Sequence, residues 1–105
     1  MNPKCTHTGS CTLDDIAAAV RRRASAIRAC YEQRLQVNPK LSGQVSVRWA
    51  IGTDGRVADA ALASSTVADA KIGDCVVRVV KRIVHAKPQT GTCDVTWSFE
   101  FSPAK

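Results

Sequence analysis

The last part of the chain carries the pattern that most restricts the fold. Apolar and polar side chains alternate without interruption over residues 93–101: Cys93, Val95, Trp97, Phe99 and Phe101 alternate with Asp94, Thr96, Ser98 and Glu100. Neighbouring side chains of a β-strand point to opposite faces of the sheet, so this pattern predicts a strand with one buried face and one wet face. Such a strand needs partner strands beside it and a second layer that covers its apolar face.

Two more strands are predicted in the middle of the chain. Residues 45–51 show the same alternation: Val45, Val47, Trp49 and Ile51 alternate with Ser46, Arg48 and Ala50. Thr53-Asp54-Gly55 then supplies a tight turn, because Asp-Gly tolerates the positive φ angles that hairpin turns require. The alanine-rich segment from Arg56 to Ser64 is expected to return as a weaker second strand of the hairpin.

Two helices are predicted on either side of this hairpin. The first should run over residues 12–36, with Thr12 as its N-cap and the Asn38-Pro39 step as its end. The second should run over residues 66–84, with Thr66 as its N-cap. In both, apolar residues recur every three or four positions: Ile16, Val20, Ala24, Ile27, Tyr31 and Leu35 in the first, and Ile72, Cys75, Val76, Val79, Val80 and Ile83 in the second.

The predicted fold is therefore α+β with the element order α-β-β-α-β. We expect a three-stranded antiparallel sheet in the order 2-1-3, with both helices packed on one face. The last strand then lies at the edge of the sheet, and the backbone donors and acceptors on its outer side are unpaired. Residues 1–11 are interpreted as an extended lead-in, residues 12–101 as one domain and residues 102–105 as a tail.

Composition agrees with one small globular domain. The chain has 105 residues, of which 45% are hydrophobic and 23% charged, so it is neither long enough for a second core nor polar enough for disorder. The net charge of +6 is compatible with an anionic partner. No apolar run approaches the ~18 residues of a membrane span. We expect any export signal to lie outside these residues, in a longer protein of which this is the C-terminal part.

Five cysteines are many for a chain of this length, and they favour an oxidising compartment. Cys30 and Cys75 occupy the same kind of position, at the margin of each helix's apolar stripe, and are either a bridge or two buried thiols. Cys5, Cys11 and Cys93 allow one further bridge and one leftover thiol, and all three pairings among them stay open.

The residues fit three other functions less well: zinc binding, catalysis and nucleic-acid binding. Cys5, His7 and Cys11 are zinc-ligand types, but their spacing is too wide and a fourth ligand is missing, so no metal or other cofactor is predicted. No nucleophile, base and acid converge, so no enzyme activity is expected. Nucleic-acid binding by a KH-like domain is the alternative, but its GxxG, Gly52-Thr53-Asp54-Gly55, joins two strands and carries an acid.

Several motifs, taken together, are specific to one family. They are Ile27-Arg28-Ala29-Cys30-Tyr31-Glu32, Asn38-Pro39-Lys40-Leu41-Ser42-Gly43, the set Val45, Val47, Trp49, Ile51, Gly55 and Val57, and Asp74-Cys75-Val76-Val77 before the last strand. With them, residues 12–101 resemble the TonB-like C-terminal domain of myxobacterial envelope proteins, in particular the gliding-motility AgmX/PglI type. Two positions differ from the family pattern: only Pro88 is kept after the second helix, and Ser98 stands where a proline usually precedes Phe-x-Phe.

The resemblance implies a function and a place. It implies a non-enzymatic periplasmic module, joined to the inner membrane only through an upstream helix outside this chain, that couples inner-membrane energy to outer-membrane components. Its partner would be an outer-membrane or periplasmic protein of the same machinery, bound by β-strand addition along Asp94, Thr96, Ser98 and Glu100; no nucleic acid is expected, and a homodimer through the same edge is the remaining option. The resemblance also favours the Cys30–Cys75 bridge, and Cys11–Cys93 is carried forward as the second candidate bridge.

Overall fold

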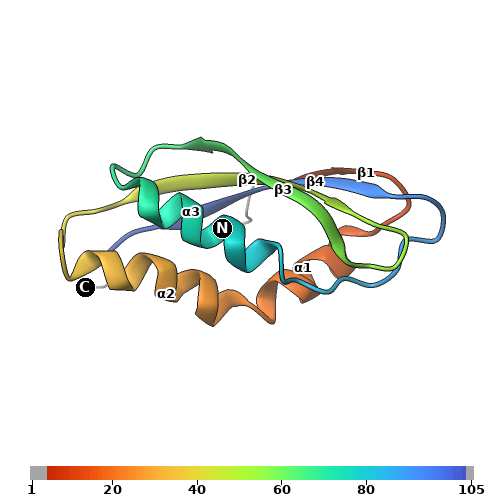
Figure 1. Cartoon of the computed structure of the whole chain (residues 1–105), viewed down its shortest axis with the longest axis horizontal. Coiled ribbons are helices and arrows are strands. Elements are labelled where there is room, and N and C mark those ends of the chain that lie inside the picture. The colour runs from red at the N-terminus through yellow and green to blue at the C-terminus, as the bar shows by residue number, and fades with distance from the viewer. Residues whose placement is uncertain (1–4, 104–105) are drawn as a thin grey trace.

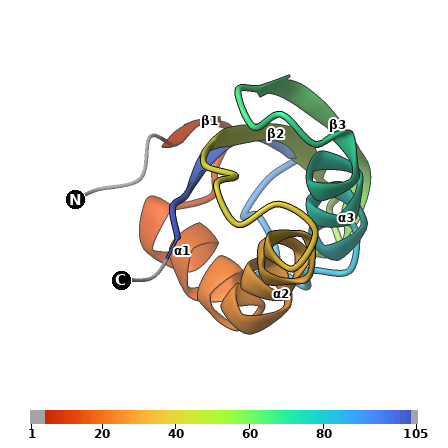
Figure 2. The same cartoon turned by 90° about the vertical axis from the view of Figure 1, so that its left-hand side faces the viewer.

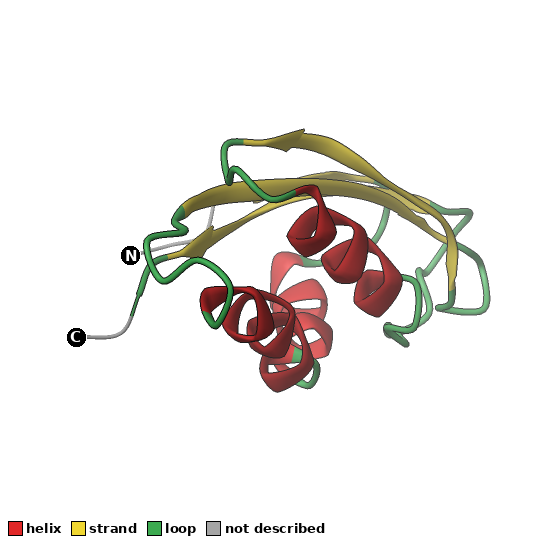
Figure 3. Ribbon diagram, turned by 60° about the vertical axis from the view of Figure 1, so that its left-hand side comes forward, coloured by secondary structure: helices red, strands yellow, loops and turns green. Residues whose placement is uncertain are grey.

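A four-stranded antiparallel sheet and three helices make up the described part of the protein. The computed structural model describes residues 5–103. The elements are β1 (Cys5–Thr8), α1 (Leu13–Arg21), α2 (Ala24–Leu35), β2 (Gly43–Ile51), β3 (Val57–Ser65), α3 (Ala70–Val80) and β4 (Cys93–Phe101). The helices lie on one face of the sheet (Figure 1, Figure 3). No helix of the described part is long and apolar enough to span a membrane.

The sheet confirms the predicted order of the three main strands and adds a fourth. Its order is β1-β4-β2-β3, in which β2 pairs with β4 over the full length from Gly43↔Phe101 to Ile51↔Cys93. The prediction of three strands is wrong, because β1 pairs antiparallel with β4 from Cys5↔Trp97 to Thr8↔Asp94. The sequence 5–8 shows no apolar alternation, because an added edge strand is held by backbone pairing and needs no buried side chains.

The core lies between the sheet and the helices. The inward residues of β2 and β4 are buried as the alternation predicts, with Val45, Val47 and Ile51 fully enclosed. α3 supplies Ile72, Val76 and Val80 from below β2 and β3, whereas α1 lies toward the β1 side of the sheet and α2 lies between α1 and α3 (Figure 2). β3 contributes little, since Ala60 is its single buried residue.

The first predicted helix is two helices. The segment expected as one helix over 12–36 breaks at Arg22 and Arg23, neither of which belongs to α1 or α2. Thr12 caps α1 as predicted, because its side chain accepts a hydrogen bond from the backbone N–H of Asp15. The break turns α2 away from the line of α1, so that the apolar stripes of both helices face the twisted sheet (Figure 1).

The second predicted helix is shorter than expected. It starts after Asp69, whose carboxylate accepts from the backbone N–H of Lys71 at 2.9 Å, and not after Thr66. Thr66 instead continues the hairpin: its N–H donates to the carbonyl of Gln44, and its hydroxyl accepts from the N–H of Gln44, both at 2.8 Å. A threonine hydroxyl can accept a hydrogen bond either from the first turn of a helix or from the backbone of a neighbouring strand. The hydroxyl of Thr66 accepts from the strand residue Gln44.

Two disulfides join segments far apart in the sequence. Cys30–Cys75 connects α2 to α3, with 5.6 Å between the Cα atoms, and confirms the bridge that the family resemblance favoured. Cys11–Cys93 connects the segment before α1 to the first residue of β4, so this candidate pairing is also confirmed. Residues 1–4, the side chain of Cys5 and residues 104–105 lie outside the described part of the molecule.

Candidate functional site

The outer side of β4 changes character half-way along the strand. Over Asp94–Trp97 it is covered by β1, so the prediction that the whole strand is a sheet edge is wrong there. Over Ser98–Phe101 the strand pairs with Gly43–Ser46 of β2 along one edge. No described strand pairs with its other, outer edge. Among the described residues, Ser98–Phe101 is therefore the part of β4 that has no strand on its outer side, and it is called the uncovered end of β4 here.

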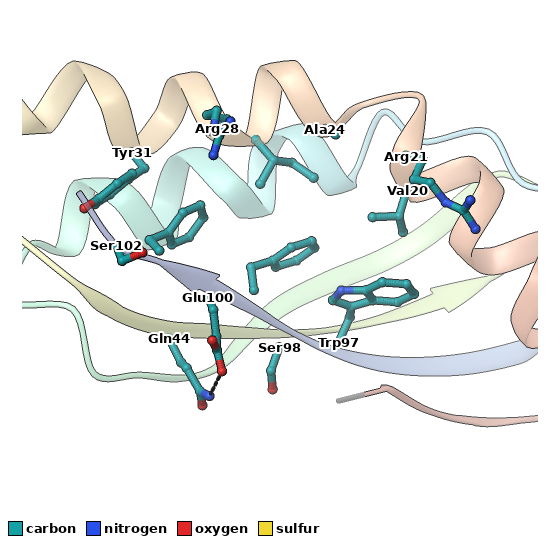
Figure 4. A pocket seen from close by; sticks show the side chains of 13 residues that line it. Val20, Arg21, Ala24, Arg28, Tyr31, Gln44, Trp97, Ser98, Glu100 and Ser102 are labelled. Carbon is teal, nitrogen blue, oxygen red and sulfur yellow. Dashed lines mark hydrogen bonds between the residues drawn. The ribbon is translucent and has the colours of Figure 1, made fainter. Parts of the chain in front are cut away.

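A groove with a volume of about 480 Å³ opens beside this uncovered end. The break between α1 and α2 and the inner face of α2 form one wall, and the end of β4 forms the other (Figure 4). Its lining residues are Val20, Arg21, Ala24, Ile27, Arg28, Tyr31, Gln44, Trp97, Ser98, Phe99, Glu100, Phe101 and Ser102. The groove therefore borders the part of β4 whose outer side no described strand pairs.

Aromatic rings form the floor of the groove. Trp97, Phe99 and Phe101 are 6–9% exposed, whereas the inward residues Val45 and Val47 of the neighbouring strand are fully enclosed. The rings of Trp97 and Phe99 stack with their centres 6.2 Å apart. The three aromatic residues of β4 are therefore slightly exposed where they line the groove.

Tyr31 fixes the helical wall against the end of β4. Its ring stacks on that of Phe101 with the centres 5.0 Å apart, and its hydroxyl donates a hydrogen bond to the backbone carbonyl of Leu41. Burial raises the pKa of Tyr31, so the hydroxyl stays a neutral donor. The groove wall is therefore held by a buried polar contact as well as by packing.

Two arginines give the groove a positive rim. Arg21 ends α1 and Arg28 lies on α2, and both are exposed beside the apolar wall (Figure 4). Within residues 5–103 the single ion pair joins Arg34 to Asp69, so neither rim arginine contacts a carboxylate. The acid nearest to them along the lining, Glu100, points to the other face of the sheet and accepts from the Gln44 amide at 3.0 Å.

The four predicted partner-binding residues lie together on the solvent-facing side of β4. Two of them belong to the part of β4 that pairs with β1. Asp94 is opposite Thr8 and Thr96 opposite Thr6. Ser98 shares a hydrogen bond of 2.6 Å with the hydroxyl of Ser46 across the sheet. Ser98 and Glu100 line the groove, but their side chains point to the face of the sheet away from the helices (Figure 4).

The groove itself was not predicted. Its helical wall comes from residues whose apolar spacing was interpreted only as core, namely Val20, Ala24 and Ile27. Ala24 belongs to the apolar stripe predicted for the first helix. In the structure it is exposed at the helix break, so the stripe extends beyond the area that the sheet covers. The sequence alone gives no position for the break, and hence none for the opening.

His85 and Cys11, which the sequence offered as candidate catalytic or zinc-binding residues, have other contacts in the structure. His85 is buried and accepts a hydrogen bond from the indole N–H of Trp49 at 3.1 Å. Cys11, one of three candidate zinc ligands, is bonded to Cys93. Across the described residues, no three His, Cys, Asp or Glu side chains gather in a way that could hold a metal ion.

Comparison with known proteins identifies the fold. The structure is similar to the NMR solution structure of the TonB C-terminal domain of Helicobacter pylori, with a TM-score of 0.54 and 18% sequence identity; the match covers 93% of this chain and 99% of that one. The chain has the fold of a TonB C-terminal domain. The TonB-like architecture predicted from the sequence motifs is thereby confirmed. No protein-family model matches the sequence, and none of the curated proteins matches it.

The TonB-like fold places the uncovered strand and the groove in one continuous surface. Residues 98–101 of β4 offer backbone groups, and α1 and α2 offer an apolar wall with a cationic rim. A flat sheet edge alone would present backbone groups only. Here an added segment would find backbone partners and side-chain contacts at the same place.

Proposed function

We propose that this domain is a non-enzymatic protein-interaction module that binds an extended segment of a partner protein by β-strand addition at residues 98–101. The observation that carries the proposal is the coincidence of an uncovered strand end with an aromatic-floored groove. In strand addition, backbone hydrogen bonds supply affinity, and pockets for alternate side chains supply specificity. The uncovered end of β4 and the groove match these two requirements.

The groove also suggests the chemistry of the partner segment. Alternate side chains of an added strand would point to the same side as Trp97 and Phe99, into the space beside Val20 and Ala24, and apolar side chains suit that space. A carboxylate at either end would meet Arg21 or Arg28, which form no ion pair with the described acidic residues. We expect a short extended segment with alternating apolar residues and an acidic residue.

The disulfides and the sequence motifs support a cellular compartment and a role for this domain. Two disulfides suit an oxidising compartment, which favours the periplasm. The resemblance of the sequence motifs to the AgmX type supports a role in gliding-motility envelope machinery, with an inner-membrane anchor upstream and energy coupling to an outer-membrane or periplasmic partner. Self-association through the uncovered edge is the competing outcome, and molecular mass measured at several concentrations would detect it.

A peptide library tests the binding mode without knowledge of the natural partner. Random dodecapeptides are selected on the oxidised protein, and a selected peptide is synthesised and mapped by amide chemical shifts. The expected footprint is residues 98–102 together with the α1–α2 wall. A footprint elsewhere, or the recovery of no binding peptide, would contradict the proposal.

Two matched pairs of variants separate the backbone from the groove. Ser98→Pro removes a backbone N–H, whereas Ser98→Ala removes the hydroxyl and keeps the N–H. Ala24→Trp fills the groove, whereas Ala26→Trp places the same side chain at an exposed position of α2 that does not line it. We expect the first member of each pair to weaken peptide binding and the second to leave it unchanged, with circular dichroism as the check on folding.

A further inference from the structure

The positive charge of the described part of the molecule is concentrated on its helices. Residues 13–36 and 69–82, which contain the three helices and their ends, carry nine Lys and Arg against five Asp and Glu, whereas the remaining described residues carry four of each. The described sheet and loops are therefore neutral overall. The excess lies on the helical layer, away from the outer face of the sheet (Figure 3).

Within this layer, the excess lies at one end of the α2–α3 pair. The two helices run antiparallel, and at one end Arg34 forms an ion pair with Asp69 at 2.7 Å. At the other end, the guanidinium of Arg23 donates to the carbonyl of Arg82 at 3.4 Å. The first end is thus neutralised by a carboxylate. The segments 16–31 and 75–93, which meet at the second end, contain no Asp or Glu.

Five exposed cations gather at this second end, where the break between α1 and α2 meets the end of α3 (Figure 1). Arg78 is four residues before Arg82, a spacing that places two side chains on the same side of a helix. Burial, and after it the charge of Arg22, lower the pKa of His85, so Arg22 lies near the segment that follows α3. The basic surface is defined here by Arg22, Arg23, Arg78, Lys81 and Arg82.

No acidic side chain neutralises the basic surface. All nine Asp and Glu residues of the chain belong to the described part, and the single ion pair among the described residues is the one between Arg34 and Asp69. Each cation taken alone suits the end of a helix, because the C-terminal end of the helix dipole is negative. Five cations in one place also repel one another, and a negatively charged partner would remove this repulsion.

We propose that the basic surface binds the anionic headgroup surface of a phospholipid bilayer. Anionic lipid attracts clusters of Lys and Arg that lie close to a membrane. None of the five side chains lines the groove beside β4, so this proposal does not rest on strand addition. Val84 is 59% exposed and follows Arg82 by two residues, and it supplies an apolar side chain for the boundary between headgroups and acyl chains.

The composition of the exposed surface favours lipid over another macromolecule. Protein interfaces are enriched in aromatic anchors, and single-stranded nucleic acid stacks on exposed aromatic rings. All five Phe, Tyr and Trp side chains of this chain are at most 9% exposed, so the basic surface includes no aromatic anchor. A bilayer requires none, because its charge is spread over a surface. The two disulfides suit an oxidising compartment such as the periplasm, which is bounded by bilayers.

Sedimentation with vesicles tests the proposal on the whole oxidised chain. Vesicles of equal parts phosphatidylcholine and phosphatidylglycerol are compared with vesicles of phosphatidylcholine alone. The test variant combines Arg78→Gln with Arg82→Gln. The control variant combines Lys40→Gln with Arg48→Gln, two exposed positions on the loop after α2 and on β2. Both variants lower the net charge of +6 by two, so a difference between them reports the position of the charges.

The expected results concern affinity and orientation. The unmodified protein should bind the anionic vesicles and not the neutral ones, and its binding should weaken with added salt, because salt screens exposed charges. The test variant should bind roughly thirtyfold more weakly, and the control variant should stay within about threefold of the unmodified protein. Circular dichroism checks folding. A spin-labelled headgroup should broaden the amide signals of residues 78–84 in the unmodified protein and leave those of residues 46–50 sharp.

Several results would overturn this assignment. They are the failure of the unmodified protein to bind anionic vesicles, equal losses in the two double variants, and broadening of residues 46–50 instead of 78–84. Tighter binding of a DNA duplex than of the vesicles, at the same concentration of phosphate, would assign the basic surface to nucleic acid instead. None of these results bears on peptide binding at residues 98–101, which the peptide library tests separately.

Discussion

His85 should make the stability of this domain depend on pH well above the range in which carboxylates titrate. The imidazole is 5% exposed; its Nε2 accepts from the indole N–H of Trp49, and its Nδ1 has no partner within the described residues. Burial, with the charge of Arg22 as a smaller cause, lowers the pKa of His85 from 6.5 to about 4. Protonation would place a charge in the core and end the hydrogen bond from Trp49, since a protonated Nε2 can no longer accept.

The sign and size of the effect follow from this shift. The unfolded chain takes up a proton near pH 6.5, whereas the folded protein resists until about pH 4. Stability is therefore complete above pH 7 and falls as the pH drops through this window. One pKa unit corresponds to about 1.4 kcal/mol, so the total loss is about 3 kcal/mol, of which about 2 kcal/mol should appear between pH 7 and pH 5.

Urea unfolding followed by tryptophan fluorescence at pH 7, 6 and 5 measures the effect. His85→Gln keeps an acceptor but does not titrate, so its free energy of unfolding should change little over this range. The chain has two histidines, and the exposed His7 offers a matched control: His7→Gln should keep the full pH dependence. The reasoning is refuted if the unmodified protein is equally stable at pH 7 and pH 5, or if His85→Gln retains its slope.

Three further measurements examine the contacts that hold the helices. Replacing Cys30 and Cys75 by serine opens a loop with a sequence separation of 45 residues, and the chain-entropy model predicts a loss of about 4 kcal/mol in urea unfolding; a loss below about 1 kcal/mol would contradict that model here. Tyr31→Phe leaves a buried backbone carbonyl unpaired and should cost about 1–2 kcal/mol by the same assay, with full retention of stability as the contrary result. The hydrogen bond from Arg34 keeps the pKa of Asp69 below its ordinary value, so Arg34→Gln should raise that pKa in an NMR titration, and an unchanged titration would argue against the contact.

Elements with a buried face were predictable from the sequence. β4 begins at Cys93 and ends at Phe101 as the alternation indicated, because each inward side chain of this strand packs into the core. β2 was predicted on the same grounds, and β3 was predicted from the turn before it, where the N–H of Gly55 donates to the carbonyl of Gly52 at 2.9 Å. In these segments the local pattern and the tertiary environment impose the same conformation.

Elements defined by backbone pairing or by packing geometry were not predictable. β1 buries no described side chain, so Thr6 and Thr8 give no periodic signal, although the candidate bridge Cys11–Cys93 did indicate that this segment is tied to the start of β4. The break at Arg22 and Arg23 carries neither proline nor glycine, so no local sequence signal marks its position. The groove depends on both of these features, which is why the sequence predicted the edge strand but not the surface beside it.

The two disulfides stabilise a small domain that has an open, partly apolar groove. Cys30–Cys75 ties the two helices that cover the middle of the sheet, and Cys11–Cys93 ties the entry of the chain to the start of β4. Neither disulfide reaches the end of β4 at Phe101, and there the core includes aromatic residues that remain slightly exposed. Because the wall and floor of the groove are already ordered, a binding segment would bear mainly the entropy cost of its own ordering. Reduction of the disulfides should therefore weaken binding at residues 98–101 even though neither bridge touches the groove, since binding would then also have to order the domain.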